Sequence, residues 1–562
     1  MTPFKRISLI TLLSLFLLPT FLKSQSISVG NLMDEQIRIR ALLSDTVTVS
    51  TVNLPFTHHI YRNYFDPGQN HGQWWNRPLT GTEINLIENV YIGLHSPIIQ
   101  NTTNSRFPFG ENNGAAWYGR GNSTEFRGGL YITSTYLTIN FYPHIIHQDN
   151  TDFLYPRFIS RRGGDVRYLH EGIGNSLDAP FRFGPESFTT FDWGNSSIRL
   201  HYNQFETGIS TEPLWWGPAI QYPLVMSNNA PGIPHFFLAS REPISIPYFG
   251  SIQFRWMFGY PEESEYFDGV GSGETRFTNA ANFAYTPPFF ENLTVGLTRV
   301  YHVFEEDGFD LRNLSLVFDP VRRSSLVSRQ GEDGTRQRRN QTASVYFHLL
   351  IPEANAEIYA EFFREDHSYD FRDLFVQPNH NSAYTFGLQK ISHVPIVDFI
   401  KTNLEFTNLT ASQLQQVRPQ TFFYTHSRIR QGHTNRGQIL GAAIGPGSNS
   451  QFFGMDAYRS NYKFGVFVQR VVDNDNFHFR EGSASLSPTE FGDYFRHRVD
   501  LNLGLNFLYG PGSFYLNSRL VWTKAYNYGR FDYGEFEGVT IQNHERNDRT
   551  NIQFQIGITY VL

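Results

Sequence analysis

The C-terminal segment 552–562 reads IQFQIGITYVL, with an apolar side chain at every second position. Gln, Gly and Thr stand between the apolar residues, so a strand formed here has one apolar face and one face of small polar groups. Residues 251–260 (SIQFRWMFGY) and 499–509 (VDLNLGLNFLY) show the same alternation. Period-two patterns predict β-strands, and over most of the chain they replace helical periodicity.

The polar faces of these strands differ from those of a soluble sheet. A face exposed to bulk water usually carries Lys and Glu, whereas Asn, Gln, Gly, Thr and single Arg residues suit a narrow hydrated interior. The apolar faces, with aromatic residues near the strand ends, suit lipid and its interfaces. The sequence therefore predicts an all-β fold, a transmembrane antiparallel β-barrel, with a soluble exported sandwich or propeller as the alternative.

Short and long connections alternate in the C-terminal part of the chain. The Gly-Pro-Gly turn 510–512 is tight, whereas the connections 471–498 and 523–551 are long and polar. Outer-membrane barrels have short turns in the periplasm and long loops outside the cell. At about 9–11 residues per transmembrane strand, the roughly 500 residues after the N-terminal region could supply about 16–22 strands.

Composition narrows the class of protein. The 562 residues are 16% aromatic and 17% charged, and the mean hydropathy is -0.37. A polytopic helical membrane protein needs repeated apolar runs of about 20 residues, and this chain has one comparable run, at its start. The absence of cysteine excludes disulfides, thiolate catalysis and Cys-ligated zinc. The net charge of -6 argues against a nucleic-acid partner, because such binders usually carry a basic surplus.

The apolar run at the start predicts an exported protein. Lys5 and Arg6 precede the apolar core 7–18, and cleavage is expected before Gln25. This pattern is typical of a signal peptide, which we assign to residues 1–24.

One short amphipathic helix is predicted after the signal peptide. Residues 31–45 (NLMDEQIRIRALLSD) place Met33, Ile37 and Ala41 at helical spacing. We therefore expect an N-terminal periplasmic or plug region with the first strands over residues 25–100. An outer-membrane barrel with extracellular loops is expected over residues 101–562.

The sequence gives little sign of catalysis. It lacks the G-x-S-x-G, H-E-x-x-H and P-loop motifs, so we expect neither enzymatic activity nor a cofactor. His144 and His147 lie three apart and so face opposite ways in a strand, and no metal site is predicted. Carboxylates such as Glu361 and Glu365 could form an acid–base pair, but their spacing in sequence does not fix their distance in space.

Two features suggest binding instead. Tryptophans beside Asn, Gln, Arg and Gly suit sugar rings, whose C–H faces stack on aromatic rings while their hydroxyls pair with amides. The alternative is packing in a plugged lumen or in an interfacial girdle. The Arg-rich segment 322–339 suits an anionic polymer, the alternative being a solvated loop. The candidate carbohydrate-binding residues are Trp74, Trp75, Trp117, Trp215, Trp216, Arg336, Arg338 and Arg339.

Five blocks in the same order resemble the Wzi-type capsule assembly proteins of bacterial outer membranes, and the resemblance extends from Phe107 to the C-terminus. The hallmark block is 212–234, EPLWWGPAIQYPLVMSNNAPGIP. The other blocks are 112–129 (NNGAAWYGRGNSTEFRGG), 182–200 (RFGPESFTTFDWGNSSIRL), 357–389 (EIYAEFFREDHSYDFRDLFVQPNHNSAYTFGLQ) and 424–448 (YTHSRIRQGHTNRGQILGAAIGPGS).

The resemblance implies a barrel of about 18 strands, occluded by loops and closed on the periplasmic side by an N-terminal helical element. It also implies a surface lectin without enzymatic activity that retains capsular polysaccharide or exopolysaccharide on the cell. The other expected partners are outer-membrane lipid, lipopolysaccharide and the barrel-assembly machinery. The alternative function is a carbohydrate-selective outer-membrane porin, which the polar lumen faces would also allow.

Overall fold

The computed structural model describes most of the chain. The described residues are 26–27, 32–43, 51–57, 73–76, 79, 83–155, 177–267, 273–304, 314–318, 339–365, 371–411, 423–426, 429–475, 497–528 and 544–561. The predicted signal peptide 1–24, Arg336 and Arg338 lie outside them.

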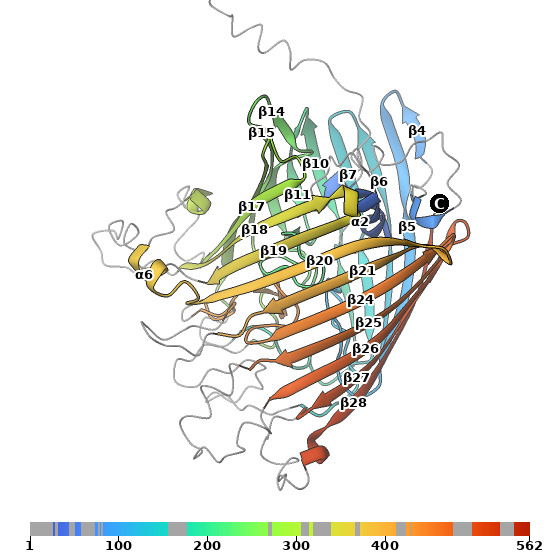
Figure 1. Cartoon of the computed structure of the whole chain (residues 1–562), viewed down its shortest axis with the longest axis vertical. Helices are drawn as coiled ribbons and strands as arrows, with labels where there is room; N and C mark the ends of the chain where they lie inside the picture. Colours follow the sequence, from blue (N-terminus) through green and yellow to red (C-terminus); the bar gives the residue numbers. More distant parts are fainter. Residues whose placement is uncertain are drawn as a thin grey trace, which may run out of the picture.

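Antiparallel strands form one closed sheet of 22 hydrogen-bonded strands (Figure 1). Three wall strands are each interrupted once, and β4 (Glu83–Ile87) is only a short hairpin partner of β5, so the wall is an 18-strand barrel. The barrel closes where β28 pairs with β5, from Gln553 opposite Asn104 to Thr559 opposite Ile98. This confirms the predicted fold class.

The wall strands follow one another around the barrel in chain order. They are β5 (Val90–Asn104), β6 (Gly121–Ser134), β7 (Leu137–Phe141) with β8 (His144–Gln148), β9 (Phe188–Asp192) with β10 (Ser197–Tyr202), β11 (Phe205–Ser210), β13 (His235–Ser240) with β14 (Ile244–Ile246), β15 (Gly250–Gly259), β16 (Arg276–Thr286), β17 (Leu293–Phe304), β18 (Arg339–Ile351), β19 (Ala356–Glu365), β20 (Ser382–Val394), β21 (Val397–Asn408), β24 (Asn449–Arg459), β25 (Tyr462–Asp473), β26 (Arg498–Tyr509), β27 (Phe514–Tyr526) and β28 (Arg549–Tyr560).

Short elements occupy the N-terminal region and the loops. They are β1 (Ser26–Ile27), α2 (Leu32–Leu43), β2 (Asn53–Leu54), β3 (Phe56–Thr57), η1 (Trp74–Asn76), β12 (Trp215–Trp216), η3 (Leu316–Phe318), η4 (Pro352–Ala354), α6 (Phe371–Val376), β22 (Thr434–Asn435), β23 (Gln438–Ile439) and η5 (His544–Asn547). No helix in the described part of the chain is long and apolar enough to cross a membrane.

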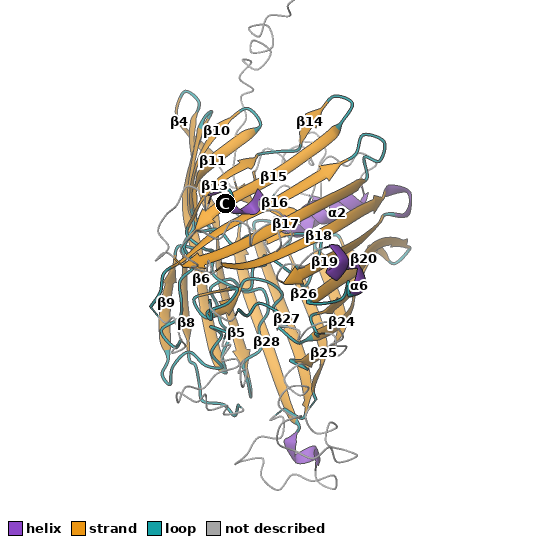
Figure 2. Ribbon diagram, turned by 90° about the vertical axis from the view of Figure 1, so that its left-hand side faces the viewer, coloured by secondary structure: helices purple, strands orange, loops and turns teal. Residues whose placement is uncertain are grey.

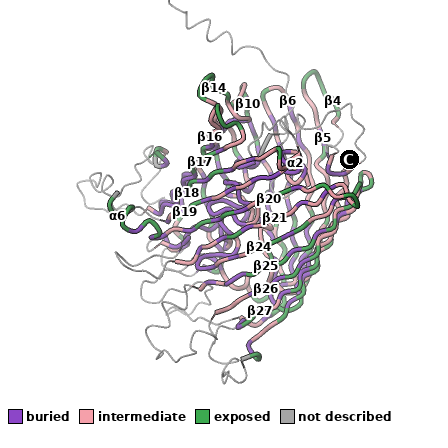
Figure 3. The backbone as a smooth tube through the Cα atoms, in the orientation of Figure 1, coloured by how far each residue is buried: buried purple, intermediate pink, exposed green. Residues whose placement is uncertain are grey.

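The wall strands have the two faces that the alternation predicts. On β28, Ile552, Phe554 and Ile558 are exposed on the outer surface, whereas Asn551 and Gln553 are buried in the lumen. Figure 3 shows this alternation of exposed and buried residues along the wall strands. The apolar outer face fits contact with lipid, and the polar inner face encloses the barrel contents.

Short turns and long loops alternate around the barrel (Figure 2). The turns 395–396, 460–461 and 510–513 join neighbouring strands at one end, whereas the segments 211–234 and 409–448 connect strands at the other. Because barrels of this class have periplasmic turns and extracellular loops, we take the short-turn end as periplasmic.

The N-terminal helix is attached to the barrel wall near the short-turn end. The predicted helix 31–45 is confirmed as α2, whose Asp34 and Glu35 stand in the first turn, where carboxylates interact favourably with the helix dipole. Glu35 accepts hydrogen bonds from Lys463 (2.7 Å), Lys401 (3.2 Å) and Tyr458 (2.5 Å), all next to the short turns. The helix is therefore clamped to the wall of the barrel.

Two long loops turn inward and fill the lumen. The loop 211–234 pairs its strand β12 with β2, so the N-terminal segment meets this loop inside the barrel. The 429–448 part of the second loop packs on it, with the Ser227 amide donating to the Leu440 carbonyl at 2.7 Å. Their apolar side chains and those of wall residues such as Phe237 and Phe363 form the largest buried cluster among the described residues.

Candidate functional site

Glu405 of β21 is the main wall anchor of the inward loop 211–234. Its buried carboxylate accepts hydrogen bonds from the backbone amides of Ile220 (2.8 Å), Gln221 (3.0 Å) and Tyr222 (2.9 Å). The Tyr359 hydroxyl donates a further bond at 2.6 Å. A loop that fills the lumen has backbone groups cut off from water, and this carboxylate satisfies three of them together.

Two more wall glutamates hold the inward loops in the same way. Glu361 accepts the backbone amide of Leu224 at 3.0 Å, and Glu365 accepts that of Tyr424 at 3.0 Å. Both carboxylates are buried. Glu361 and Glu365 therefore have a structural role, because each anchors a different inward loop. The sequence had suggested only that they could form an acid–base pair.

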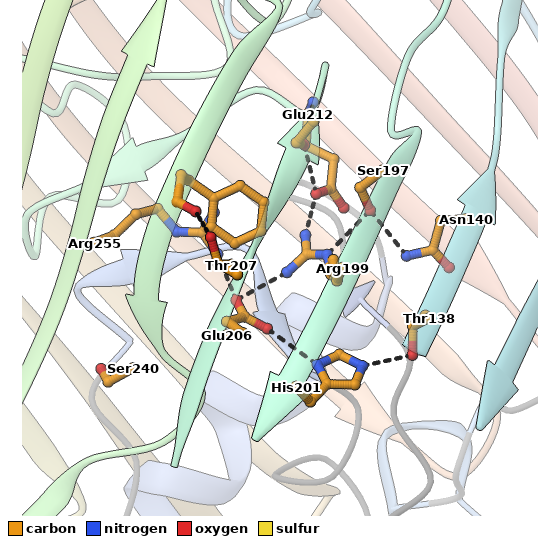
Figure 4. Close-up of polar contacts among 12 residues, drawn as sticks. Thr138, Asn140, Ser197, Arg199, His201, Glu206, Thr207, Glu212, Ser240 and Arg255 are labelled. Carbon is orange, nitrogen blue, oxygen red and sulfur yellow. Dashed lines mark hydrogen bonds and ion pairs between the residues drawn. The ribbon is translucent and has the colours of Figure 1, made fainter. Parts of the chain in front are cut away.

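A buried ion-pair network fixes the short strands from which the loop 211–234 departs (Figure 4). Glu206 of β11 accepts hydrogen bonds from Arg199 and Arg255, each at 3.0 Å, and Arg199 also pairs with Glu212 at the loop entrance. Both guanidinium groups lie over the Phe237 ring, at 5.3 and 4.5 Å from its centre. The network therefore joins β10, β11 and β15 to the base of the loop.

A pocket of about 140 Å³ lies at the long-loop end of the barrel, and residues of both inward loops form part of its lining. Residues of the loop 105–120 form one side, and the adjoining ends of β25 and β26 form another. Its main polar and aromatic lining residues are Glu111, Asn113, Trp117, Tyr118, Asn229, Gln438, Asp473, Arg498, Asp500 and Asn502. We call it the outer pocket.

The polar groups of the outer pocket are held in place by one another. Arg498 donates to both oxygens of Asp500 (2.9 and 2.7 Å), and its guanidinium lies 4.6 Å from the centre of the Tyr528 ring. The Gln438 side chain donates to the Asn229 carbonyl at 2.8 Å. Amides, carboxylates and a fixed guanidinium beside an aromatic ring are the groups that bind hydroxyl-rich ligands.

Trp117 supplies the indole of the outer pocket. It is partly exposed and packs against Phe183 and Phe153, with ring centres 5.1 and 6.5 Å apart. Gly119 leaves room for it, because a Cβ there would stand 2.6 Å from the indole ring. The glycine at position 119 therefore allows the Trp117 ring to occupy this place, where it lines the outer pocket.

The other predicted tryptophans lie deeper in the barrel. Trp74 and Trp75 are 0% and 7% exposed and pack beside α2, with Trp75 in edge contact with Phe399. Trp215 and Trp216 are 6% and 0% exposed in the inward loop. Of these four rings, Trp215 also borders a larger cavity inside the barrel. Trp117 is thus the predicted tryptophan that the structure brings to the outer pocket.

The structure describes only one residue, Arg339, of the predicted basic segment 322–339. Arg339 is the first residue of β18 and stands opposite Val303, whereas Arg336 and Arg338 lie outside the described residues. A role of this segment in binding stays a prediction. Among the described residues, no group of three or more His, Asp or Glu side chains could hold a metal ion.

Several outer-pocket residues were not predicted from the sequence. Asn229 and Gln438 belong to the two blocks 212–234 and 424–448, so their polar side chains within those blocks were an available signal. Asp473, Arg498 and Asp500 stand at strand ends, and nothing in their spacing indicated that they meet.

The attachment of α2 to the barrel wall through Glu35 depends on pH in a defined way. Burial raises the pKa of Glu35, but attraction by Lys463 and Lys401 and hydrogen bonding outweigh it, so the pKa lies well below its ordinary 4.5. A carboxylate with a lowered pKa stabilises the fold above its unfolded pKa and loses this effect as the pH falls through the folded one. We expect α2 to stay docked from neutral pH to about pH 4.5 and to be released only in stronger acid.

Hydrogen exchange of the α2 amides, followed by mass spectrometry across this pH range, measures the release. Glu35→Gln should exchange rapidly already at neutral pH, whereas Glu88→Gln, in the exposed turn after β4, should behave like the unaltered protein. If α2 were released near pH 4.5, the ordinary pKa of a glutamate, Glu35 would not hold the helix in the way proposed.

Comparison with known proteins gives a family match and several solved structures. The family model described as capsule assembly protein Wzi matches residues 97–518. The Escherichia coli outer-membrane protein Wzi, described as a carbohydrate-binding β-barrel involved in group 1 capsule assembly, has 12% sequence identity and a TM-score of 0.58, covering 95% of this chain and 99% of that chain. At this identity, the likeness is one of fold.

Other solved barrels are less similar. OprD from Pseudomonas aeruginosa has 10% identity and a TM-score of 0.38, covering 83% of this chain and 92% of that chain. OccAB2 from Acinetobacter baumannii has 12% identity and a TM-score of 0.38, covering 84% of this chain and 98% of that chain. No curated protein matches the sequence.

Proposed function

Because the chain belongs to the Wzi family of capsule assembly proteins, we propose that it binds an exported polysaccharide at the outer pocket and retains that polymer on the cell. The protein is an outer-membrane β-barrel, so the long-loop end faces the cell exterior. The polymer bound there is a capsular polysaccharide or exopolysaccharide.

The observation that carries this proposal is the outer pocket above a filled lumen. Trp117 offers a partly exposed aromatic ring, while Asn113, Asn229 and Gln438 bring amides to the same small space. Stacking on C–H faces together with hydrogen bonds to hydroxyls is the usual chemistry of sugar binding. The inward loops form part of the pocket wall, so a ligand bound there stays at the long-loop end of the barrel.

A small pocket is sufficient when the ligand is a long polymer. One repeating unit in a pocket of about 140 Å³ gives weak binding. A single chain can engage many protein copies on one cell, so that weak contacts combine into firm retention. Arg336, Arg338 and Arg339 stay predicted contacts for acidic units of the polymer.

A carbohydrate-selective porin is the alternative function. It requires a continuous aqueous path, whereas the described part of this chain places two inward loops and the N-terminal segment in the lumen. Backbone anchoring by Glu405, Glu361 and Glu365 makes this filling a fixed part of the structure. The filled lumen favours retention of the polymer over its passage.

Trp117→Ala is expected to weaken polymer binding about tenfold, because a central aromatic ring often dominates a binding site. Cells lacking the protein are supplied with either the unaltered or the altered chain, and fluorescently labelled polysaccharide retained on washed cells is measured. Trp193→Ala is the matched control, since Trp193 is 56% exposed on the outer face of the wall beside Phe141 and Phe191.

Retention should fall with Trp117→Ala and stay unchanged with Trp193→Ala. Equal retention by cells with and without the protein would refute the proposed function. Equal loss in both variants would show that the outer pocket is not the binding site.

A further inference from the structure

A second, larger cavity of about 540 Å³ lies inside the barrel, between the plug helix and the wall. Leu32 of α2 and Val561 line it at the periplasmic rim, and Glu111 and Asn112 line it below the outer pocket. Strands β5 and β26 to β28 supply much of its wall. We call it the inner cavity.

Arg519 of β27 is the distinctive charged group of the inner cavity. Its guanidinium lies 5.0 Å from the centre of the Phe467 ring. Its Nε is buried and has no hydrogen-bond partner among the described residues. The other cations lining the cavity are paired: Lys401 and Lys463 with Glu35, Arg38 with Asp34, and Arg127 with Glu125.

Glu111, the acidic residue that attracts Arg519, is itself hydrogen-bonded to Tyr222. Burial raises the pKa of Glu111, and Tyr222 donates a hydrogen bond to its carboxyl group at 2.7 Å. The donor left for an anion in the cavity is the buried Nε of Arg519, which has no hydrogen-bond partner in the described part of the chain.

Amide side chains line the inner cavity beside this charge. Asn506 of β26 and Gln555 of β28 stand directly opposite Arg519 in the sheet, and Asn517 lies two residues before it on β27. Amides both donate and accept hydrogen bonds, which matches sugar hydroxyls better than it matches a simple inorganic anion.

We propose that the inner cavity binds an anionic sugar unit, a hexuronate, with its carboxylate on Arg519 and its hydroxyls on the surrounding amides. The planar guanidinium suits a carboxylate, which it can bind through two parallel hydrogen bonds. The buried Leu508 of β26 adds an apolar surface to the lining. The inner cavity shares Glu111 with the lining of the outer pocket but is otherwise lined by different residues, and this proposal does not depend on the proposed function.

The test is isothermal titration calorimetry of the full chain in detergent at low salt, with digalacturonate as the probe and maltose as a neutral disaccharide of similar size. Digalacturonate should bind more tightly than maltose, and added salt should weaken it. Arg519→Gln should reduce the affinity for digalacturonate at least tenfold, because a charged hydrogen bond is lost. Arg519→Lys should keep part of the affinity.

Arg470→Gln is the matched control, since Arg470 is exposed on β25 and lines neither pocket. Gln555→Leu gives a second probe of the same site without a change in charge, since Gln555 stands opposite Arg519, and heat-modified migration of the barrel in gels verifies the folding of each variant. Affinity for digalacturonate that is the same in the unaltered protein and in Arg519→Gln, or no preference over maltose, would overturn the proposal.

Trp117→Ala separates the two sites. It should leave digalacturonate binding intact while it lowers polymer retention on cells. Loss of polymer retention therefore tests the outer pocket, and loss of digalacturonate binding tests the inner cavity.

Discussion

Replacing Glu206 with Ala is expected to lower the free energy of unfolding of the barrel by about 3–5 kcal/mol, the usual cost of removing one partner from a buried ion pair. Glu206 is buried between Arg199 and Arg255, which donate to the same carboxylate oxygen. The variant leaves Arg255 without its carboxylate partner and Arg199 with Glu212 alone. Removing the carboxylate therefore leaves uncompensated positive charge in the lumen wall.

Denaturant unfolding of the purified barrel, followed by tryptophan fluorescence, measures this loss. Glu353→Ala is the control, since Glu353 is exposed in the short turn between β18 and β19. Glu206→Gln should fall between the two variants, because it keeps the shape of the side chain and loses its charge. A stability of Glu206→Ala equal to that of Glu353→Ala would show that the network of Figure 4 contributes nothing to stability.

Replacing Glu405 with Ala is expected to open the lumen. The change removes the acceptor of three backbone amides in the loop 211–234 and of the Tyr359 hydroxyl. Each hydrogen bond to a charged group contributes about 1.5–3 kcal/mol, so the loop loses its main attachment to β21. Single-channel recordings in planar bilayers should then show sustained currents in the variant and none in the unaltered protein.

Glu353→Ala is again the control, and its recordings should stay silent. Sustained open-pore currents from the unaltered protein would support the porin alternative and exclude a filled lumen. Silent recordings from Glu405→Ala would show that the remaining contacts, including those of Glu361 and Glu365, hold the loops without Glu405.

The wall of the barrel could be predicted from sequence because each strand carries its own signal. In β15, β26 and β28, apolar and polar residues alternate with the period of a strand, and the buried and exposed faces follow that period. The helix α2 was predictable for the same reason, from local spacing and its acidic first turn. Such signals need no knowledge of distant residues.

The contents of the barrel could not be predicted in this way. Glu405 and Ile220 are 185 residues apart, and no local pattern indicates that one carboxylate holds a loop so distant in sequence. The inward course of this loop also determines that Trp215 and Trp216 are buried while Trp117 lines the outer pocket. All three stand beside polar and Gly residues in the sequence, so local composition does not distinguish them.

The central claim is that the outer pocket holds an exported polysaccharide, and its most direct test is surface plasmon resonance. The purified barrel is immobilised, and polysaccharide isolated from the same cells is passed over it. We predict saturable binding to the unaltered protein and to Trp193→Ala, and binding about tenfold weaker to Trp117→Ala. Equal binding to all three proteins, or no binding to the unaltered one, would contradict the claim.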